Sequence, residues 1–110
     1  MKPLWMFVFP LLVTLAHGEE STLYARENLV AWCIVPFDVA KRGPEARAQM
    51  LIGLGLKQCA YDWRAEHVPS FEEEIRQYAK HGITFFAFWG AHEGAFALFK
   101  KYQLTPQIWQ

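Results

Sequence analysis

The side chains best suited to acid–base chemistry follow one another between Asp62 and His67, in the stretch DWRAEH. Glu66 and His67 combine a carboxylate with an imidazole, two groups that serve as general acids and bases. Asp62, Trp63 and Arg64 add an acid, a ring and a cation that could bind a substrate. The structural alternative is that Asp62 and Arg64 form an ion pair or cap the loop while His67 lies in solvent. Both interpretations stay open, because charge clusters mark functional sites only in part.

A second group, WGAHE, occupies positions 89–93. Trp89 offers a flat ring with His92 and Glu93 beside it, a combination typical of carbohydrate recognition. The alternative places Trp89 in the core and lets Glu93 complement the dipole of a helix that begins there. We favour the helix-dipole role for Glu93 and leave Trp89 open.

Three further residues are expected to be structural. Trp32 lies inside an apolar run, and we expect it in the core. Cys33 is a poor nucleophile candidate, because a thiol surrounded by apolar residues has a raised pKa and is poorly accessible to a substrate. We expect Cys33 and Cys59 to be unpaired, because a disulfide across adjacent parallel strands needs a particular side-chain direction. Their separation is not that of a zinc motif.

The secondary-structure elements that must position these residues are predicted from apolar runs that alternate along the sequence with more polar segments. Continuous apolar, β-branched and aromatic runs predict strands that are buried on both faces. We predict strands over 28–35, 56–62 and 83–89, and the start of a fourth at 107–110. Helices are predicted between them, from Pro44 to Gly55, from Ser70 to His81 and around 95–102.

Local signals define the helix ends and buried faces. Gly43 and Pro44 open the first helix, and Ser70 and Glu73 predict a capping box at the start of the second, which Gly82 ends. The apolar spacing predicts these buried positions: Ala46, Met50, Leu51 and Leu54; Phe71, Ile75, Tyr78 and Ala79; Ala95, Leu98, Phe99 and Tyr102.

Strand–helix units that recur at roughly 30 residues predict a parallel sheet with right-handed crossovers. Such a sheet is either open and doubly wound or part of a (β/α)8 barrel. No glycine-rich phosphate loop follows the first strand, where IVPFD stands, and this favours the barrel. A full barrel takes about 250 residues. The predicted fold class is therefore α/β, the first half of a TIM barrel truncated after the start of strand 4.

Composition excludes several classes of protein. With 53% hydrophobic and 20% charged residues, the sequence is neither disordered nor collagen-like. Eleven Lys and Arg balance eleven Asp and Glu, so the formal net charge is zero. A neutral chain offers no general attraction to nucleic acid or to anionic lipid, and neither is an expected partner.

The first residues predict a secretory signal peptide. Lys2 precedes the apolar run LWMFVFPLLVTLA, which leads into AHG. The run is shorter than the roughly 20 residues that span a bilayer, and Pro10 interrupts it. We expect cleavage after Gly18, export to the periplasm or medium, and no stable membrane span afterwards. Residues 19–27 then form a polar leader, and 28–110 form the partial barrel.

Several runs carry a resemblance to a known family: NLVAWCIVPFD, YDWRAEH, KHGI and FKKYQLTPQIWQ. With the order of the elements, they resemble the N-terminal half of xylose isomerase-like TIM barrels, in the sugar phosphate isomerase/epimerase superfamily. The resemblance covers about residues 28–110.

The resemblance implies a barrel that binds a divalent metal (Mn, Mg or Zn) and a small sugar or sugar derivative. Its chemistry would be aldose–ketose isomerisation, or epimerisation beside a carbonyl. The family's metal ligands come mainly from later strands, so the resemblance assigns none here, and we expect this half to be inactive alone. The candidate catalytic residues are Glu66 and His67. The candidate sugar-binding residues are Asp62, Trp63, Arg64, Trp89 and His92.

Two other functions compete with this interpretation. In the first, the chain is a non-catalytic carbohydrate-binding or degenerate half barrel whose aromatic strand ends give the affinity. Its exposed strand edges would favour self-association. In the second, it is a metal-dependent phosphodiesterase of the endonuclease IV type, which shares the barrel. Neutral charge and export argue against DNA as a substrate.

Overall fold

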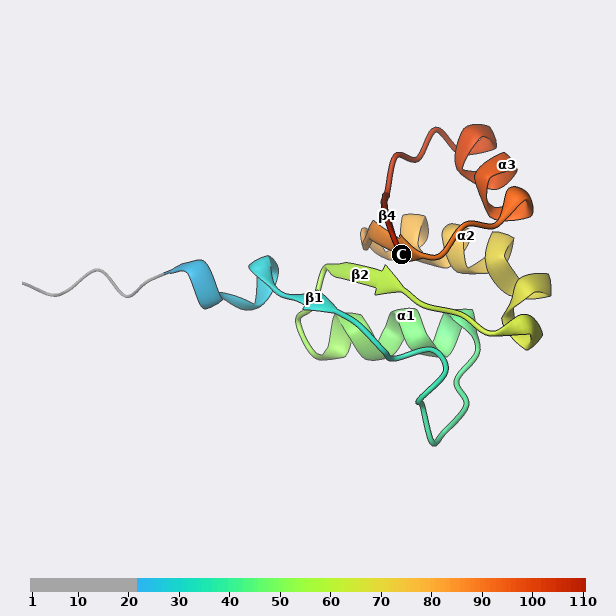
Figure 1. The fold of residues 1–110 in the computed structure, drawn as a ribbon. Helices are drawn as coiled ribbons and strands as arrows, with labels where there is room; N and C mark the ends of the chain where they lie inside the picture. Colours follow the sequence, from blue (N-terminus) through green and yellow to red (C-terminus); the bar gives the residue numbers. More distant parts are fainter. Residues whose placement is uncertain (1–21) are drawn as a thin grey trace, which may run out of the picture.

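The structure is a computed structural model, and it describes residues 22–110. Its strands and helices alternate along the chain (Figure 1). They are β1 (Val30–Ala31), α1 (Pro44–Gly53), β2 (Gln58–Tyr61), α2 (Phe71–His81), β3 (Thr84–Trp89), α3 (Glu93–Lys101) and β4 (Gln107–Trp109). Short 3₁₀ segments are Thr22–Tyr24, Arg26–Asn28 and Ala65–Ser70. The predicted signal peptide, residues 1–18, lies outside the described residues.

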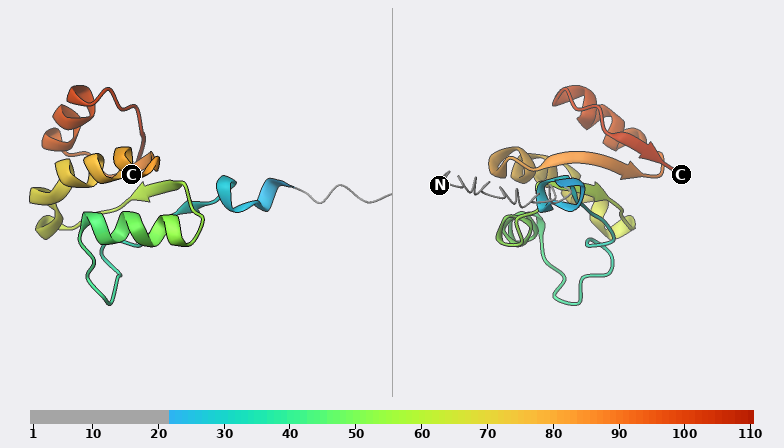
Figure 2. Two further views of the ribbon diagram at one scale, coloured as in Figure 1. Left: turned by 180° about the vertical axis from the view of Figure 1, so that it is seen from behind. Right: turned by 90° about the vertical axis from the view of Figure 1, so that its left-hand side faces the viewer.

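The four strands form one parallel sheet in the order β1-β2-β3-β4. This confirms the predicted α/β fold of successive strand–helix units. Each strand lies beside its predecessor, and right-handed crossovers in a constant direction place successive helices on one face of the sheet. Figure 2 shows the three helices of the described residues following one another around the sheet. None of these helices is long and apolar enough to cross a membrane.

The first strand is shorter than the sequence predicts. An extended strand over 28–35 is wrong, because β1 ends at Ala31 and the chain then turns. Cys33 has a φ of 61°, a left-handed backbone conformation that no regular strand contains. The apolar run continues beyond Ala31, but its remaining residues belong to the loop that leads into α1.

Helix α1 has the predicted ends but a different buried face. Pro44 opens it and Gly55 follows its end with a φ of 73°. Of the four residues predicted to be buried, only Leu51 is, while Leu54 is 52% exposed. Arg47 and Ala48 are buried instead. The buried face of α1 differs from the prediction because it includes Arg47, whose side chain forms an ion pair with an acidic residue of α2. Hydrophobic spacing does not predict such a pair.

The predicted capping box at Ser70 is wrong. Ser70 ends a 3₁₀ segment that continues directly into α2, and its side chain caps no helix N–H group. Its Oγ donates to the His67 carbonyl oxygen at 2.8 Å instead. A capping serine accepts from the second or third N–H group of a helix whose start lacks acceptors. Here the chain is already helical before α2, and even the Phe71 N–H donates to the carbonyl of Val68.

The end of α2 is as predicted. Gly82 has a φ of 67°, and the Ile83 N–H donates to the Tyr78 carbonyl at 2.9 Å. This is the left-handed helix stop that glycine favours. The predicted buried faces of α2 and α3 are largely confirmed by the burial of Phe71, Ile75, Tyr78, Ala95 and Phe99. Ala79 is exposed, and the acid Glu74 is buried in its place.

The core between helices and sheet is mainly aromatic. Cys59 pairs with Phe85 but Ala60 pairs with Ala87, so β3 carries one extra residue, Phe86, at a bulge. The bulge lets Phe85 and Phe88 both point towards the helices, where each contacts the Phe99 ring. The same cluster contains Tyr61, Phe71, Ile75 and Tyr78.

Candidate functional site at the carboxyl edge of the sheet

Three indole rings gather where the strands end. Trp32 follows β1, Trp89 ends β3 and Trp109 ends β4. Trp32 stacks on Trp89 with ring centroids 5.7 Å apart and meets Trp109 edge-on at 5.9 Å. We call these three residues the tryptophan cluster. Trp89 and Trp109 are register partners, and they share the face opposite the helices because neighbouring Phe88 points into the core.

The tryptophan cluster is accessible to a ligand. Trp32 is 49% exposed and Trp89 is 41% exposed, so the predicted core position of Trp32 is wrong. The reason is that β1 ends one residue before Trp32, and none of the helices within residues 22–110 covers that face of the sheet. Exposed clustered rings are unusual on a soluble chain and mark binding surfaces. Flat apolar rings of this kind stack well on the C–H face of a sugar.

Asp62 and Cys33 lie at the same edge, one residue after β2 and two residues after β1. Asp62 is buried, and its Oδ1 atom has no hydrogen-bond partner among the described residues. Burial raises the pKa of Asp62 above its ordinary value, although its own backbone N–H and the Arg64 charge counteract the rise. Burial and the Asp62 charge also raise the pKa of Cys33, so this thiol is a poor nucleophile. Both cysteines are free.

The raised pKa of Asp62 predicts a pH-dependent stability. A carboxyl whose pKa is higher in the folded than in the unfolded chain favours folding when protonated, and this contribution is lost as pH rises through the folded pKa. We therefore expect Asp62→Asn to be more stable than the wild type at about pH 7, with the difference shrinking towards about pH 4. Urea unfolding of both chains across this range measures it.

The matched control for this experiment is Gln110→Asn, which changes an exposed side chain just after β4 without changing a titratable group. Its stability relative to the wild type should vary little with pH. A constant stability difference between Asp62→Asn and the wild type at all pH values would contradict the role of burial.

Two candidate sugar-binding residues, Trp63 and His92, hold loops together. The Trp63 Nε1–H donates to the Trp89 carbonyl at 2.7 Å, which ties the end of β2 to the end of β3. His92 Nδ1 accepts from the Ala95 N–H at 3.2 Å, so His92 caps α3. Its ring also meets Trp63 edge-on at 5.1 Å. Histidine is not a usual N-cap residue, so the sequence offered little signal for this contact.

Arg64 is exposed and contacts both its own loop and the loop after β1. Its guanidinium lies over the Phe37 ring at 5.4 Å, a cation–π contact, and donates to the Trp63 carbonyl at 2.9 Å. No ion pair joins Arg64 to Asp62 among residues 22–110. The two residues therefore do not form the direct pair considered from the sequence.

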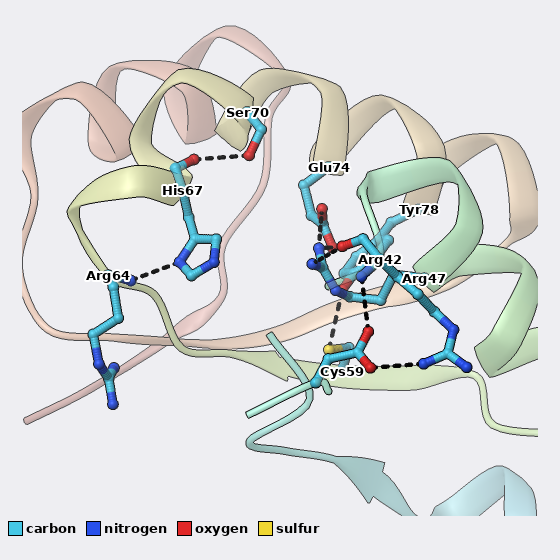
Figure 3. Close-up of polar contacts among 9 residues, drawn as sticks. Arg42, Arg47, Cys59, Arg64, His67, Ser70, Glu74 and Tyr78 are labelled. Atoms are coloured by element: carbon cyan, nitrogen blue, oxygen red, sulfur yellow. Dashed lines mark hydrogen bonds and ion pairs between the residues drawn. The ribbon is translucent and has the colours of Figure 1, made fainter. Parts of the chain in front are cut away.

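Glu66 and His67 lie on the rim of a cavity of about 370 Å³. His67 Nδ1 accepts from the Arg64 N–H at 2.8 Å (Figure 3), so a neutral His67 carries its proton on Nε2. The side chains of Glu66 and His67 share no hydrogen bond within the described part of the chain. The other polar side chains that line the cavity are Asp38, Lys41, Arg42, Arg47 and Ser70. We call this the basic cavity.

Arg47, which lines the basic cavity, belongs to a buried ion pair. Arg47 Nη1 lies 2.7 Å from both carboxylate oxygens of Glu74, and Arg47 Nη2 donates to the Arg42 carbonyl at 2.6 Å. Beside the pair, the Tyr78 hydroxyl donates to Cys59 Sγ at 3.2 Å. Burial raises the pKa of Cys59 to about 12. Sequence spacing had pointed to neither Arg47 nor Glu74.

The divalent metal that the family resemblance implies does not fit the described residues on their own. Within 22–110, no three His, Cys, Asp or Glu side chains come together to hold an ion. Mg²⁺ and Mn²⁺ prefer several oxygen ligands, and among residues 22–110 Asp62 is the one buried carboxylate at this edge of the sheet.

Comparison with protein-family models, curated proteins and solved structures found no match. Function is therefore inferred from the arrangement of residues at the carboxyl edge of the sheet.

Proposed function

We propose that this chain binds a sugar on the open face of its sheet, through the tryptophan cluster. The observation that carries the proposal is the ring geometry: two stacked, half-exposed indoles and a third ring edge-on to one of them. Ligands of parallel α/β sheets bind beyond the carboxyl ends of the strands, which is where these rings lie. An uncharged ring surface suits a neutral, C–H-rich ligand better than an ionic one.

More specifically, we propose that this sheet is the first half of a xylose isomerase-like barrel. The sequential strand order supports it, because a barrel adds each strand beside the last, whereas a doubly wound sheet reverses direction. The tryptophan cluster would then face the barrel interior and orient a sugar for isomerisation or epimerisation. A divalent metal would polarise the sugar carbonyl when bound. Its ligands would come from outside residues 22–110, and the signal peptide would place the reaction outside the cytoplasm.

The second candidate function is sugar binding without catalysis. It is favoured by the separation of the two groups of residues: Glu66 and His67 line the basic cavity, and no member of the tryptophan cluster does. Binding at the rings then needs no acid/base pair. In this form, copies of the chain would associate through the edge strands β1 and β4.

Trp89→Ala tests sugar binding. We expect the wild-type chain to bind at least one member of a panel of aldoses and ketoses, and the variant to bind it about tenfold more weakly, because a central aromatic anchor contributes more than about 1 kcal/mol. Ligand-observed NMR is the suitable measurement, since removing an indole also changes fluorescence. Phe96→Ala is the control, because Phe96 is 40% exposed on α3, away from the cluster.

A chain that also supplies the later strands of the barrel, with their metal ligands, separates the two forms of the proposal. Conversion of the bound sugar to its ketose or epimer by that longer chain with Mn²⁺ or Mg²⁺ supports the isomerase form. Saturable sugar binding without conversion by the longer chain supports the binding module. Equal binding by the wild type and Trp89→Ala, or no binding of any sugar, contradicts both.

A further inference from the structure

We propose that two copies of this chain associate edge to edge, with β4 of each copy paired to β1 of the other, and enclose both tryptophan clusters in one eight-stranded barrel. The surface involved consists of the two outer strands of the sheet, Val30–Ala31 and Gln107–Trp109. This association rests on the shape of the sheet and not on sugar binding. It would supply the geometry of the self-association in the second candidate function.

The outer strands lack the features that protect the edges of a sheet. Natural edge strands avoid pairing with other chains by means of charged residues, prolines or bulges. Within residues 22–110, neither β1 nor β4 contains a charged residue or a proline, and the bulge of the sheet lies on β3. Three of the four residues of the inner strand β2 are buried, whereas none of the three residues of β4 is. Both outer strands therefore present backbone groups with which a further strand could pair.

The backbone of β4 shows which groups a neighbouring strand would use. The Trp109 carbonyl accepts from the Gly90 N–H at 2.6 Å, on the β3 side. Because the backbone groups of successive strand residues point to opposite sides of the strand, those of Ile108 point away from β3. The Ile108 side chain is 41% exposed, and so is that of Leu29, directly before β1. A strand added at this edge would pair with Ile108 and cover part of its side chain.

The side chains at the carboxyl edge converge as they do inside a barrel. Neighbouring strands lie about 4.8 Å apart, so β1 and β4 would be about 14 Å apart in a flat sheet. Trp32 follows β1 and Trp109 ends β4, yet their ring centroids are 5.9 Å apart. The rings therefore meet over the face opposite the helices, which is the concave face of a curved sheet.

A second copy of this chain fits both edges at once. The strand β4 needs a parallel neighbour, and β1 of another copy supplies one from a sheet of the same direction and curvature. The β4 strand of that copy then meets β1 of the first. Two four-stranded sheets thus close a ring of eight parallel strands, the number in a (β/α)8 barrel. An extended peptide could pair with one edge but would leave the other edge unpaired.

We call each contact between β4 of one copy and β1 of the other a seam. Stable interfaces bury about 1,200–2,000 Å², and a seam of two or three residues covers far less. The closed dimer has two seams, and it also brings together the indole rings of both copies, of which Trp32 and Trp89 are half-exposed in one copy. The rings of the second copy would form the opposite wall of the proposed sugar site, so each copy would complete the site of the other.

Sedimentation equilibrium of the purified chain tests the proposal. We expect the wild type to form a dimer, and Ile108→Lys to raise the dissociation constant at least about tenfold, because a lysine on an edge strand opposes pairing. Val39→Lys is the matched control. It places the same charge on another β-branched residue, which is 99% exposed in the loop after β1, and it should leave the dimer intact.

Ile108→Pro tests the backbone pairing separately from the side chain. It removes the N–H group that faces away from β3 but adds no charge, and edge strands tolerate proline at such a position. This variant should also weaken dimerisation. Circular dichroism of each variant shows whether it is folded.

Three results would overturn the proposal. A monomeric wild type would assign the edges to another occupant, such as further strands of a longer chain. Open polymers that grow with concentration would show that two sheets do not close on each other. Equal dissociation constants for Ile108→Lys and Val39→Lys would place the contact elsewhere. Sugar binding is measured separately, so a dimer that binds no sugar contradicts only the proposed function, and a monomer that binds sugar contradicts only the dimer.

Discussion

Replacing Glu74 with Gln is expected to lower the free energy of unfolding by about 3–5 kcal/mol. The variant keeps the shape of the side chain but leaves the Arg47 guanidinium buried without a counter-charge, 2.7 Å from a neutral amide. Glu74 is fully buried and Arg47 nearly so, so water cannot take over the lost interaction. Urea denaturation followed by circular dichroism measures the change. The loss is a large share of the 5–15 kcal/mol that holds a typical domain folded.

Two further variants define the cause of that loss. Glu73→Gln changes the neighbouring acid, whose 3.7 Å pair with Arg76 is exposed, and it should cost less than about 1 kcal/mol. The double variant Arg47→Met with Glu74→Leu removes both charges from the buried site. It should recover most of the stability, because a hydrophobic pair of similar volume often replaces a buried ion pair without loss. A single and a double variant of equal stability would show that the pairing of charges is not what matters.

Replacing Phe88 with Ala is expected to cost about 3–5 kcal/mol, through the transfer energy and the cavity that it leaves. Phe88 is 1% exposed at the centre of the core. Its ring stacks on Tyr61 and Trp63 and meets Phe71 and Phe99 edge-on. Because the Phe88 ring holds so many other rings in place, the cavity left by Phe88→Ala cannot close unless both α2 and α3 move. Thermal and urea unfolding measure the stability, and the near-ultraviolet circular dichroism should weaken as the rings lose their fixed packing.

The control for Phe88 is a phenylalanine that the structure leaves at the surface. Phe96 lies on α3 and is 40% exposed, so Phe96→Ala should change the free energy of unfolding by less than about 1 kcal/mol. Similar losses for the two variants would contradict the assignment of Phe88 to the centre of the core.

Local sequence signals predicted the elements that depend on a few neighbouring residues. The stop of α2 at Gly82 follows from the left-handed conformation that glycine tolerates. The spacing of Ala95 and Phe99 predicted the buried face of α3, because helical periodicity acts within two turns of the chain. The alternation of strands and helices in turn predicted the parallel sheet.

Local patterns were misleading where the adjoining backbone adopts a conformation that residue types alone do not reveal. Ser70 and Glu73 have the spacing of a capping box, but a 3₁₀ turn before them removes the need for one. The run after Asn28 reads as a continuous buried strand, yet the left-handed turn at Cys33 ends the pairing early and leaves Trp32 exposed.

In the candidate sites too, local sequence predicted some features and the tertiary structure decided others. By itself, the sequence determined which residues follow the strands, and so placed Asp62, His67 and Trp89 at one edge of the sheet. Only the tertiary structure decided their neighbours: Trp32 and Trp109 join Trp89, and Arg47 pairs with Glu74 across 27 residues of chain. The physical reason is that backbone preferences and hydrophobic periodicity act over a few residues, whereas burial of a charge or exposure of a ring depends on which segments the fold brings together.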